Sequence, residues 1–176
     1  MATGGFVLGL FCTFAVIGNR VPGGGNVDQV LSIAQAEVGV REVGQNGGKR
    51  VTEYLAYTGI RVPAPYCAAF VSFVFWKAGY AVPRTAWSPA LFPAGRLVGS
   101  GSLGSGSVRH DGKGLVFGIY FPDLKRIAHV GLVESVRGDW LTTIEANTNV
   151  EGSREGQGVY RRLRHKRTIA KYANWL

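Results

Sequence analysis

The sequence is poor in cysteine and in acidic residues, and it has no apolar run of the ~20 residues that a membrane-spanning helix needs. Two cysteines, Cys12 and Cys67, are too few for a disulfide scaffold, and no Cys/His cluster has the spacing of a zinc site. Eleven acidic residues against 20 basic ones give a formal charge of +9. An anionic partner is therefore expected, and nucleic acid, acidic lipid and the bacterial wall all satisfy that expectation.

The first 25 residues form an apolar segment followed by a glycine-rich linker. The segment, "MATGGFVLGLFCTFAVIGNR", is about as long as a signal-peptide core, but it lacks a basic start and a clear cleavage site. It is either a degenerate export signal or an ordinary buried or docking segment. We place one domain over residues 26–176, after the linker "VPGGGN".

The domain has helical patterns first and strand patterns later. Apolar spacing predicts helices in "NVDQVLSIAQAEV", capped by Asn26 or Asp28, and in "RVTEYLAYTGI". A third helix, Ala68 to Ala78, is apolar almost all round and is expected to be buried. Strands are predicted at 115–121, 127–136, 140–147 and 158–165. This order indicates an α+β fold with N-terminal helices and a central buried helix packed on an antiparallel β-sheet.

Cys67 stands at the start of the buried helix, in "PYCAAFVSFVFWKAGY". A helix N-terminus lowers the pKa of a cysteine, and the thiolate is the form that attacks carbonyl groups. A free cysteine is also among the most often buried residue types, so the position alone fits a core residue equally well. A nucleophile needs a base from elsewhere in the chain.

Of the three histidines, His129 is the candidate base. His110 lies in a glycine-serine loop and His165 in a basic run, whereas His129 sits inside the strand pattern "IAHVGLVESV". The following strand, "WLTTIEANTN", carries Glu145 and Asn147 two residues apart and therefore on one face. Both need a polar partner in a half-buried sheet.

The turn "VRGDW" decides whether these side chains meet. A three-residue loop, Arg137 to Asp139, would pair Val136 with Trp140, so that His129 faces Asn147 and lies diagonal to Glu145. A two-residue loop without a bulge would place them on opposite faces. The first register is the one that a Cys–His hydrolase requires, with Glu145 orienting the imidazole and Asn147 as a second polar support.

The order "PYCAAFVSFVFWKAG", "AHVGLVES" and "TIEANT" resembles the CHAP family, the cysteine- and histidine-dependent amidohydrolase/peptidase domains. The upstream "EVGVREVGQNGGKRVTEYL" is similar to the helix–loop–helix of one peptidoglycan-hydrolase branch, so the resemblance covers most of the chain from Val27. It implies a papain-like fold and cleavage of an amide bond in bacterial peptidoglycan, by an N-acetylmuramoyl-L-alanine amidase or by a stem or cross-bridge endopeptidase.

Carried over to this sequence, the resemblance implies catalytic roles for Cys67, His129, Glu145 and Asn147. We also expect Tyr66 and Trp87 to bind substrate, and no cofactor or structural metal. The implied location is extracellular, periplasmic or in the cell wall, reached by export or by delivery from a phage particle or a secretion system, which the N-terminal segment could dock.

The sequence departs from the family before His129, where "GKGLVFGIYF" replaces the usual Pro-Gly-Asp start, and at Tyr66, where tryptophan is common. These departures bear on the rim of the cleft and hence on substrate preference. No papain-like glutamine precedes Cys67, so the Cys67 backbone N–H is the only oxyanion donor assigned.

Basic residues gather near the C-terminus: Arg154, Arg161, Arg162, Arg164, Lys166, Arg167 and Lys171. They form either a solvated face or a surface for anionic wall polymers. A nucleic-acid-binding module with a structural Cys67 is the first alternative, but few aromatics interleave the basic residues and no nucleic acid is expected. The second is a cysteine peptidase or deamidase acting outside the wall.

Overall fold

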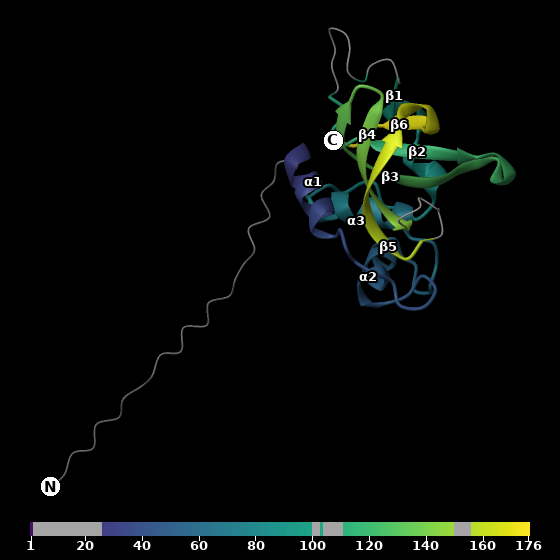
Figure 1. Cartoon of the computed structure of the whole chain (residues 1–176). Helices are drawn as coiled ribbons and strands as arrows, with labels where there is room; N and C mark the ends of the chain where they lie inside the picture. The colour runs from purple at the N-terminus through teal and green to yellow at the C-terminus, as the bar shows by residue number, and fades with distance from the viewer. Residues whose placement is uncertain (2–25, 100–102, 104–110, 150–155) are drawn as a thin grey trace.

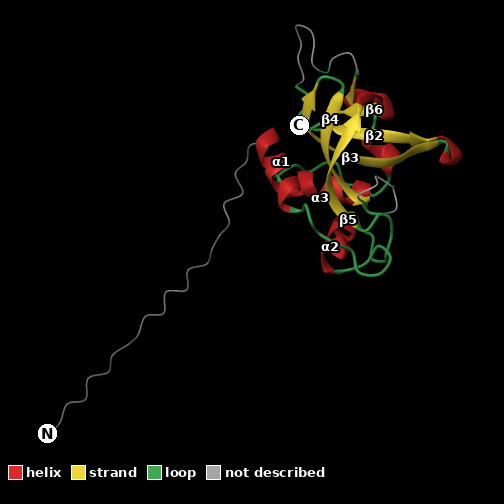
Figure 2. Cartoon of the chain, viewed as in Figure 1, coloured by secondary structure: helices red, strands yellow, loops and turns green. Residues whose placement is uncertain are grey.

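The computed structural model describes Met1 and residues 26–99, 103, 111–149 and 156–176. The apolar segment with Cys12, the loop with His110, and Arg154 lie outside the described residues. The fold is α+β, as predicted: three α-helices accompany a six-stranded antiparallel sheet (Figures 1 and 2). Within the described part of the chain, none of the helices has the length and apolar character needed to span a membrane.

The three helices match the three helical patterns. They are α1 (Val27–Ala36), α2 (Lys49–Tyr57) and α3 (Cys67–Lys77). The Asn26 side chain caps α1 by accepting a hydrogen bond from the Gln29 N–H at 2.9 Å. In α3 every residue from Cys67 to Phe75 is buried, and α1 and α2 pack against it. The predicted central helix is therefore confirmed.

The sheet has the strand order β1-β6-β2-β3-β4-β5. Four strands were predicted: β2 (Val116–Phe121), β3 (Arg126–Arg137), β4 (Trp140–Thr148) and β5 (Gly158–His165). The short β1 (Leu97–Val98) and β6 (Lys171–Ala173) were not predicted, because two or three residues carry no readable alternation. Val130, Leu132, Ile144 and Ala146 of β3 and β4 belong to the same core cluster as α3.

The β3–β4 hairpin reaches the expected register by an unexpected route. Arg137 pairs with Trp140, so the loop has two residues, the shorter of the two lengths considered from the sequence. Glu134 is an extra residue in β3, since Val133 pairs with Thr143 and Ser135 with Thr142. This β-bulge shifts the pairing by one residue, and Gly131 then lies opposite Glu145. His129 is thus diagonal to Glu145, as the sequence predicts.

The segment that follows α1 extends the sheet beyond β5. The Gly39 N–H donates to the Val159 carbonyl at 3.0 Å, the Val159 N–H donates to the Val40 carbonyl at 2.9 Å, and the Glu42 N–H donates to the Gln157 carbonyl at 2.9 Å. These bonds hold residues 39–42 beside the start of β5, and they place Glu42 on the same side of the molecule as the end of β4.

A buried serine fixes the chain that follows α3. Ser72 has no exposed surface; its hydroxyl donates to the Thr85 carbonyl at 2.8 Å and accepts from the Thr85 N–H at 3.0 Å. The chain next enters the short helix η1 (Ser88–Leu91), whose first residue reaches Cys67. One hydroxyl therefore anchors the segment that completes the surroundings of the thiol.

We expect Ser72→Ala to lower the free energy of unfolding by about 1–3 kcal/mol, because two partly buried backbone groups of Thr85 lose their partner. Urea unfolding of the two proteins measures the loss. Equal midpoints and slopes for both would contradict the anchoring role.

Candidate active site

Cys67 is the first residue of α3, and 4% of its surface is exposed. The Tyr66 side chain makes no capping hydrogen bond at this helix end, so the first N–H groups of α3 are left without a side-chain cap. Ser88 lies beside the thiol, with 3.5 Å between its Oγ and the Cys67 Sγ. The thiol is thus surrounded by groups that favour negative charge on sulfur.

His129 lies in the middle of β3 and is 1% exposed. Its Nε2 is 2.8 Å from Oε2 of Glu145. Its Nδ1 is also buried, and among the described residues it has no hydrogen-bond partner. Since ionised Glu145 can only accept, Nε2 must carry the proton in the neutral ring, and Nδ1 keeps its lone pair.

The thiol and the imidazole change each other's ionisation. Burial acts to raise the pKa of the Cys67 thiol, but His129 opposes it, with smaller help from Ser88 and the Val130 backbone, and the net pKa is lowered. Burial acts to lower the pKa of His129, but Cys67 and Glu145 outweigh it and raise that pKa to about 9. The two shifts belong to one coupled pair, since each group is among the causes that shift the pKa of the other.

Glu145 is a fully buried carboxylate with three side-chain partners. Besides His129, it accepts from the Thr143 hydroxyl at 2.6 Å and from Arg164 through two N–H groups at 2.8 and 2.6 Å. Burial acts to raise the pKa of Glu145, but Arg164 and then His129 hold it at about 2. The carboxylate therefore stays charged and fixes the orientation of the imidazole.

Gly131 makes room for this arrangement. It lies opposite Glu145, and a Cβ at this position would come within 2.9 Å of the Glu145 Cγ and 2.8 Å of the Phe117 ring. Any larger residue would displace the carboxylate or the aromatic ring beneath it. The small residue in "AHVGLV" is thus part of the site, which the sequence reading did not recognise.

Thr143 and Arg164 were also missed as members of the site. Thr143 precedes Glu145 by two residues and so shares its face, which alternation could have indicated. Arg164 pairs with Leu141, which lies on that same face of β4, but the register of β5 is needed to see this. Its side chain is 14% exposed and bound to Glu145, so it is not part of a solvated basic face.

The other predicted site residues lie around this centre. Asn147 is 3% exposed and occupies a bulge of β4 with φ at 55°, while Trp87 is 53% exposed and directly precedes Ser88. The Arg126 guanidinium stacks on the Trp87 ring at 4.3 Å from its centroid. Their catalytic and substrate-binding roles stay predictions.

Tyr66 requires a correction, because it has no exposed surface. Its ring packs in the core beside Tyr54, with 6.2 Å between the ring centroids. A side chain buried in this way supports the turn that leads into Cys67 and offers no surface to a substrate. The sequence could not show this, since aromatic residues beside a nucleophile are found both in cleft walls and in cores.

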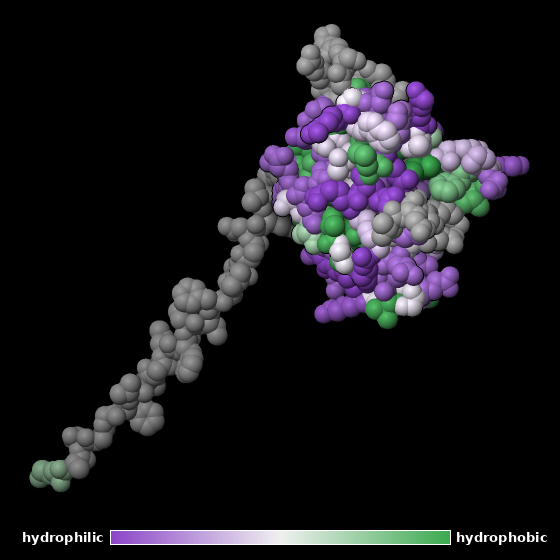
Figure 3. Space-filling view, in the orientation of Figure 1, coloured by the Kyte–Doolittle hydropathy of each residue, from purple (hydrophilic) through white to green (hydrophobic). Residues whose placement is uncertain are grey.

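The basic surface is smaller than the sequence indicates. Arg161 holds Glu134 through two bonds of 2.6 and 2.7 Å, and Arg164 is taken by Glu145. Arg167 and Lys171 are exposed, and the face seen in Figure 3 is largely hydrophilic, with apolar side chains scattered over it. Within residues 26–99, 103, 111–149 and 156–176, no three His, Cys, Asp or Glu side chains gather as in a metal site.

Alkylation of Cys67 by iodoacetamide tests the coupled pair. Because the pKa of Cys67 is lowered, its reaction should stay fast well below the ordinary thiol pKa of about 8.5. In His129→Ala the main group that opposes the effect of burial on the Cys67 pKa is gone, so the rate at neutral pH should fall at least about tenfold. Mass spectrometry of the Cys67 peptide separates this reaction from that of Cys12. Identical pH profiles in both proteins would contradict the pairing.

Arg164→Met should lower the free energy of unfolding at neutral pH by about 3–5 kcal/mol, because it leaves a buried carboxylate with one charged partner fewer. The lowered pKa of Glu145 stabilises the fold above the unfolded-state value of about 4.3, and this stability is lost as pH falls toward 2. The variant should therefore lose less stability than the wild type between neutral pH and pH 3.

Arg161→Met is the matched control for Arg164→Met, since it removes a half-exposed ion pair with Glu134 and should cost only about 0.2–1 kcal/mol. Urea unfolding at two pH values measures all three proteins. Equal losses of unfolding free energy in the two variants would show that the ion pair of Arg164 with Glu145 stabilises the fold no more than an exposed ion pair does.

No family model matches the sequence, and no curated protein matches it. The chain is similar in structure to Ly7917, with a TM-score of 0.47 and 20% identity over 84% of this chain and 61% of that one. It is also similar to Ly7917 with the hydrolyzing product of MDP, with a TM-score of 0.44 and 18% identity over 84% and 62%. The chain thus spans less than two thirds of those chains, and its function must be argued from its own site.

Proposed function

We propose that the protein is a cysteine hydrolase that cleaves an amide bond of bacterial peptidoglycan. The observation that carries the proposal is the state of His129: Glu145 fixes Nε2 at 2.8 Å, the buried Nδ1 has no hydrogen-bond partner in the described part of the chain, and the His129 side chain lowers the pKa of Cys67. A merely structural histidine would use both ring nitrogens in hydrogen bonds. This one keeps a proton acceptor for the thiol.

The chemistry follows from this arrangement. Nδ1 of His129 accepts the thiol proton, and the thiolate of Cys67 attacks the amide carbonyl carbon to form a tetrahedral oxyanion. The Cys67 backbone N–H donates to that oxygen. The intermediate collapses as the imidazolium protonates the leaving amine and the C–N bond breaks. Water, deprotonated by His129, then attacks the acyl-enzyme and releases the acid and the thiol.

Ser88 supplies a further polar group at the reacting sulfur. Its hydroxyl, 3.5 Å from Sγ, can donate to the thiolate before attack or to the oxyanion after it. The sequence offers no glutamine for the side-chain half of the oxyanion hole, and Ser88 is the residue that we assign to this place. Its position depends on the Ser72 anchor described above.

The wall substrate rests on three supports. The sequence resembles CHAP domains in the order of its motifs, the net charge of +9 favours an anionic surface, and Trp87 presents an exposed aromatic ring next to Ser88 on which a sugar or peptide group could stack. The same centre serves an amidase that cuts the amide bond between N-acetylmuramic acid and L-alanine and an endopeptidase of the stem or cross-bridge. A location outside the cytoplasm belongs to the same proposal.

Digestion of purified peptidoglycan tests this function. Wild type should release fragments with new amino ends, whereas Cys67→Ala should release none, because it lacks the sulfur that forms the acyl-enzyme. Mass spectrometry of the fragments identifies the bond that is cut. Cleavage of a folded protein without any action on peptidoglycan would transfer the proposal to a non-wall hydrolase, and equal action by Cys67→Ala would refute the cysteine mechanism.

A further inference from the structure

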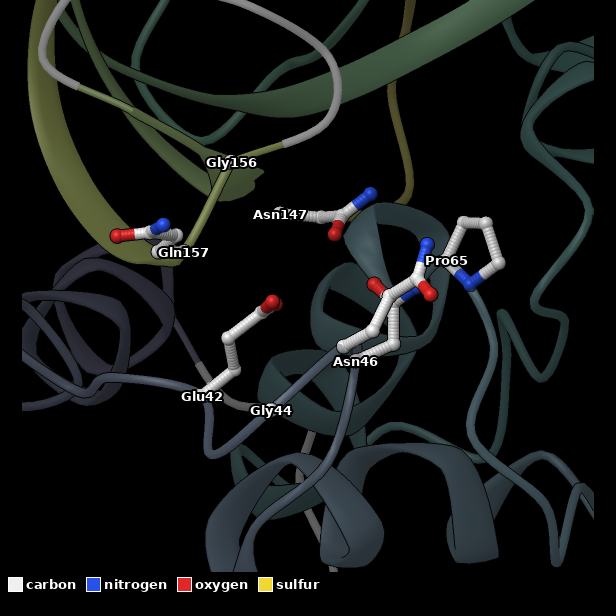
Figure 4. Close-up of a pocket in the computed structure, with 8 residues that line it drawn as sticks. Glu42, Gly44, Asn46, Pro65, Asn147, Gly156 and Gln157 are labelled. Carbon is white, nitrogen blue, oxygen red and sulfur yellow. The ribbon is translucent and has the colours of Figure 1, made fainter.

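A polar cavity of about 520 Å³ lies between the residues shown in Figure 4. Two of its lining residues connect it to the Cys67–His129 centre: Pro65 is two residues before Cys67, and Asn147 is two residues after Glu145. The full lining is Glu42, Gly44, Gln45, Asn46, Pro65, Asn147, Gly156 and Gln157. The cavity is therefore lined in part by the segment that leads into α3 and by the end of β4, the two elements that carry Cys67 and Glu145.

Backbone geometry builds the cavity wall opposite Asn147. The pairing of Glu42 with Gln157 fixes one side, and the Val43 N–H closes a tight loop by donating to the Gly47 carbonyl at 3.0 Å. Asn46 sits in this loop with φ at 57°, a conformation that asparagine tolerates better than most residues. The loop is thus shaped by its own hydrogen bonds, and it turns the Glu42 and Asn46 side chains inward (Figure 4).

Glu42 is the single charged side chain among the residues that line the cavity. Its carboxylate points into the space, and its Oε2 is buried with no hydrogen-bond partner among the described residues (Figure 4). The buried hydroxyl of Tyr66 lies close by: burial raises the pKa of Tyr66, and the negative charge of Glu42 and a side-chain hydrogen bond to Glu42 raise that pKa further. A neutral hydroxyl does not balance the charge of a carboxylate, so the buried Oε2 favours a ligand that supplies a cation.

We propose that Glu42 binds a protonated primary amine of the substrate, held beside the amide bond that Cys67 attacks. The proposal rests on the function inferred above, and it names the part of the substrate that this side of the cleft selects. An ammonium group satisfies Oε2 with a charge-assisted hydrogen bond. The carboxamides of Asn46 and Asn147, which lie on the Pro65 side of the cavity in Figure 4, suit the neighbouring peptide groups.

The local charge separates this cavity from the rest of the molecule. A protein with net charge +9 repels cations in general. Glu42, with no basic side chain beside it in the lining, makes this cavity attractive to a cation. It disfavours a free carboxylate in the same position, because two like charges would share a partly buried site. In a wall peptide, the positively charged primary amines are the side-chain amine of a diamino acid and a free amino end.

Binding to the inactive Cys67→Ala protein tests the proposal directly. The two probes are a muramyl tripeptide that ends in lysine and the same tripeptide acetylated on the lysine side-chain nitrogen. Calorimetry should give a Kd about 10- to 100-fold lower for the free amine, the effect of one charge-assisted hydrogen bond. Adding Glu42→Gln to Cys67→Ala should remove this preference. Adding Asp123→Asn, which deletes an exposed negative charge elsewhere, should preserve it.

Equal affinity for the two probes, no binding of either, or a preference that survives Glu42→Gln would overturn the assignment of Glu42. The proposed function is judged separately by the action of the wild-type protein on peptidoglycan. If the wild type cuts peptidoglycan while Cys67→Ala binds the free and the acetylated amine equally, the proposed function holds and the amine subsite does not. Thermal unfolding of each variant shows whether a loss of binding reflects a loss of the fold.

Discussion

Glu145 carries a negative charge with no exposed surface, and the bonds that satisfy it determine how the rest of the site is arranged. Thr143 of the same strand and Arg164 of β5 hold the carboxylate. The carboxylate can therefore orient the imidazole of His129 without taking a proton from it. Because the Nε2 proton is committed to Glu145, Nδ1 is the atom that can serve Cys67. The charge on one buried carboxylate thus assigns the role of each ring nitrogen.

The fold class, the three helices and the four longer strands could be predicted from periodicity, because each is long enough to repeat its pattern. For the hairpin between β3 and β4, the register could be predicted but the loop length and the bulge that produce it could not. A three-residue loop and a two-residue loop with a bulge at Glu134 give the same register at Gly131 and Glu145. The sequence "VRGDW" does not distinguish them, since a bulge depends on pairing along the whole hairpin.

The site was predicted where chemistry is carried by residue type and missed where it depends on distant contacts. Polar residues such as His129 and Glu145 in apolar elements need polar partners, and together with Cys67 they indicate one shared network. Arg164 lies in a run of basic residues that looks like a solvated face, and only the β4–β5 register reveals its buried partner. Tyr66 shows the opposite error, because proximity to Cys67 in sequence does not decide whether a ring faces the cleft or the core.

NMR titration of the His129 ring nitrogens shows whether Cys67 and His129 share one proton in a buried pair. In the wild type the ring should stay doubly protonated until about pH 9 and should then lose the Nδ1 proton, keeping Nε2–H toward Glu145. In Cys67→Ala the thiolate is gone, so the His129 pKa should fall. A ring that titrates near the ordinary value of about 6.5 in both proteins, or that keeps Nδ1–H when neutral, would contradict the account.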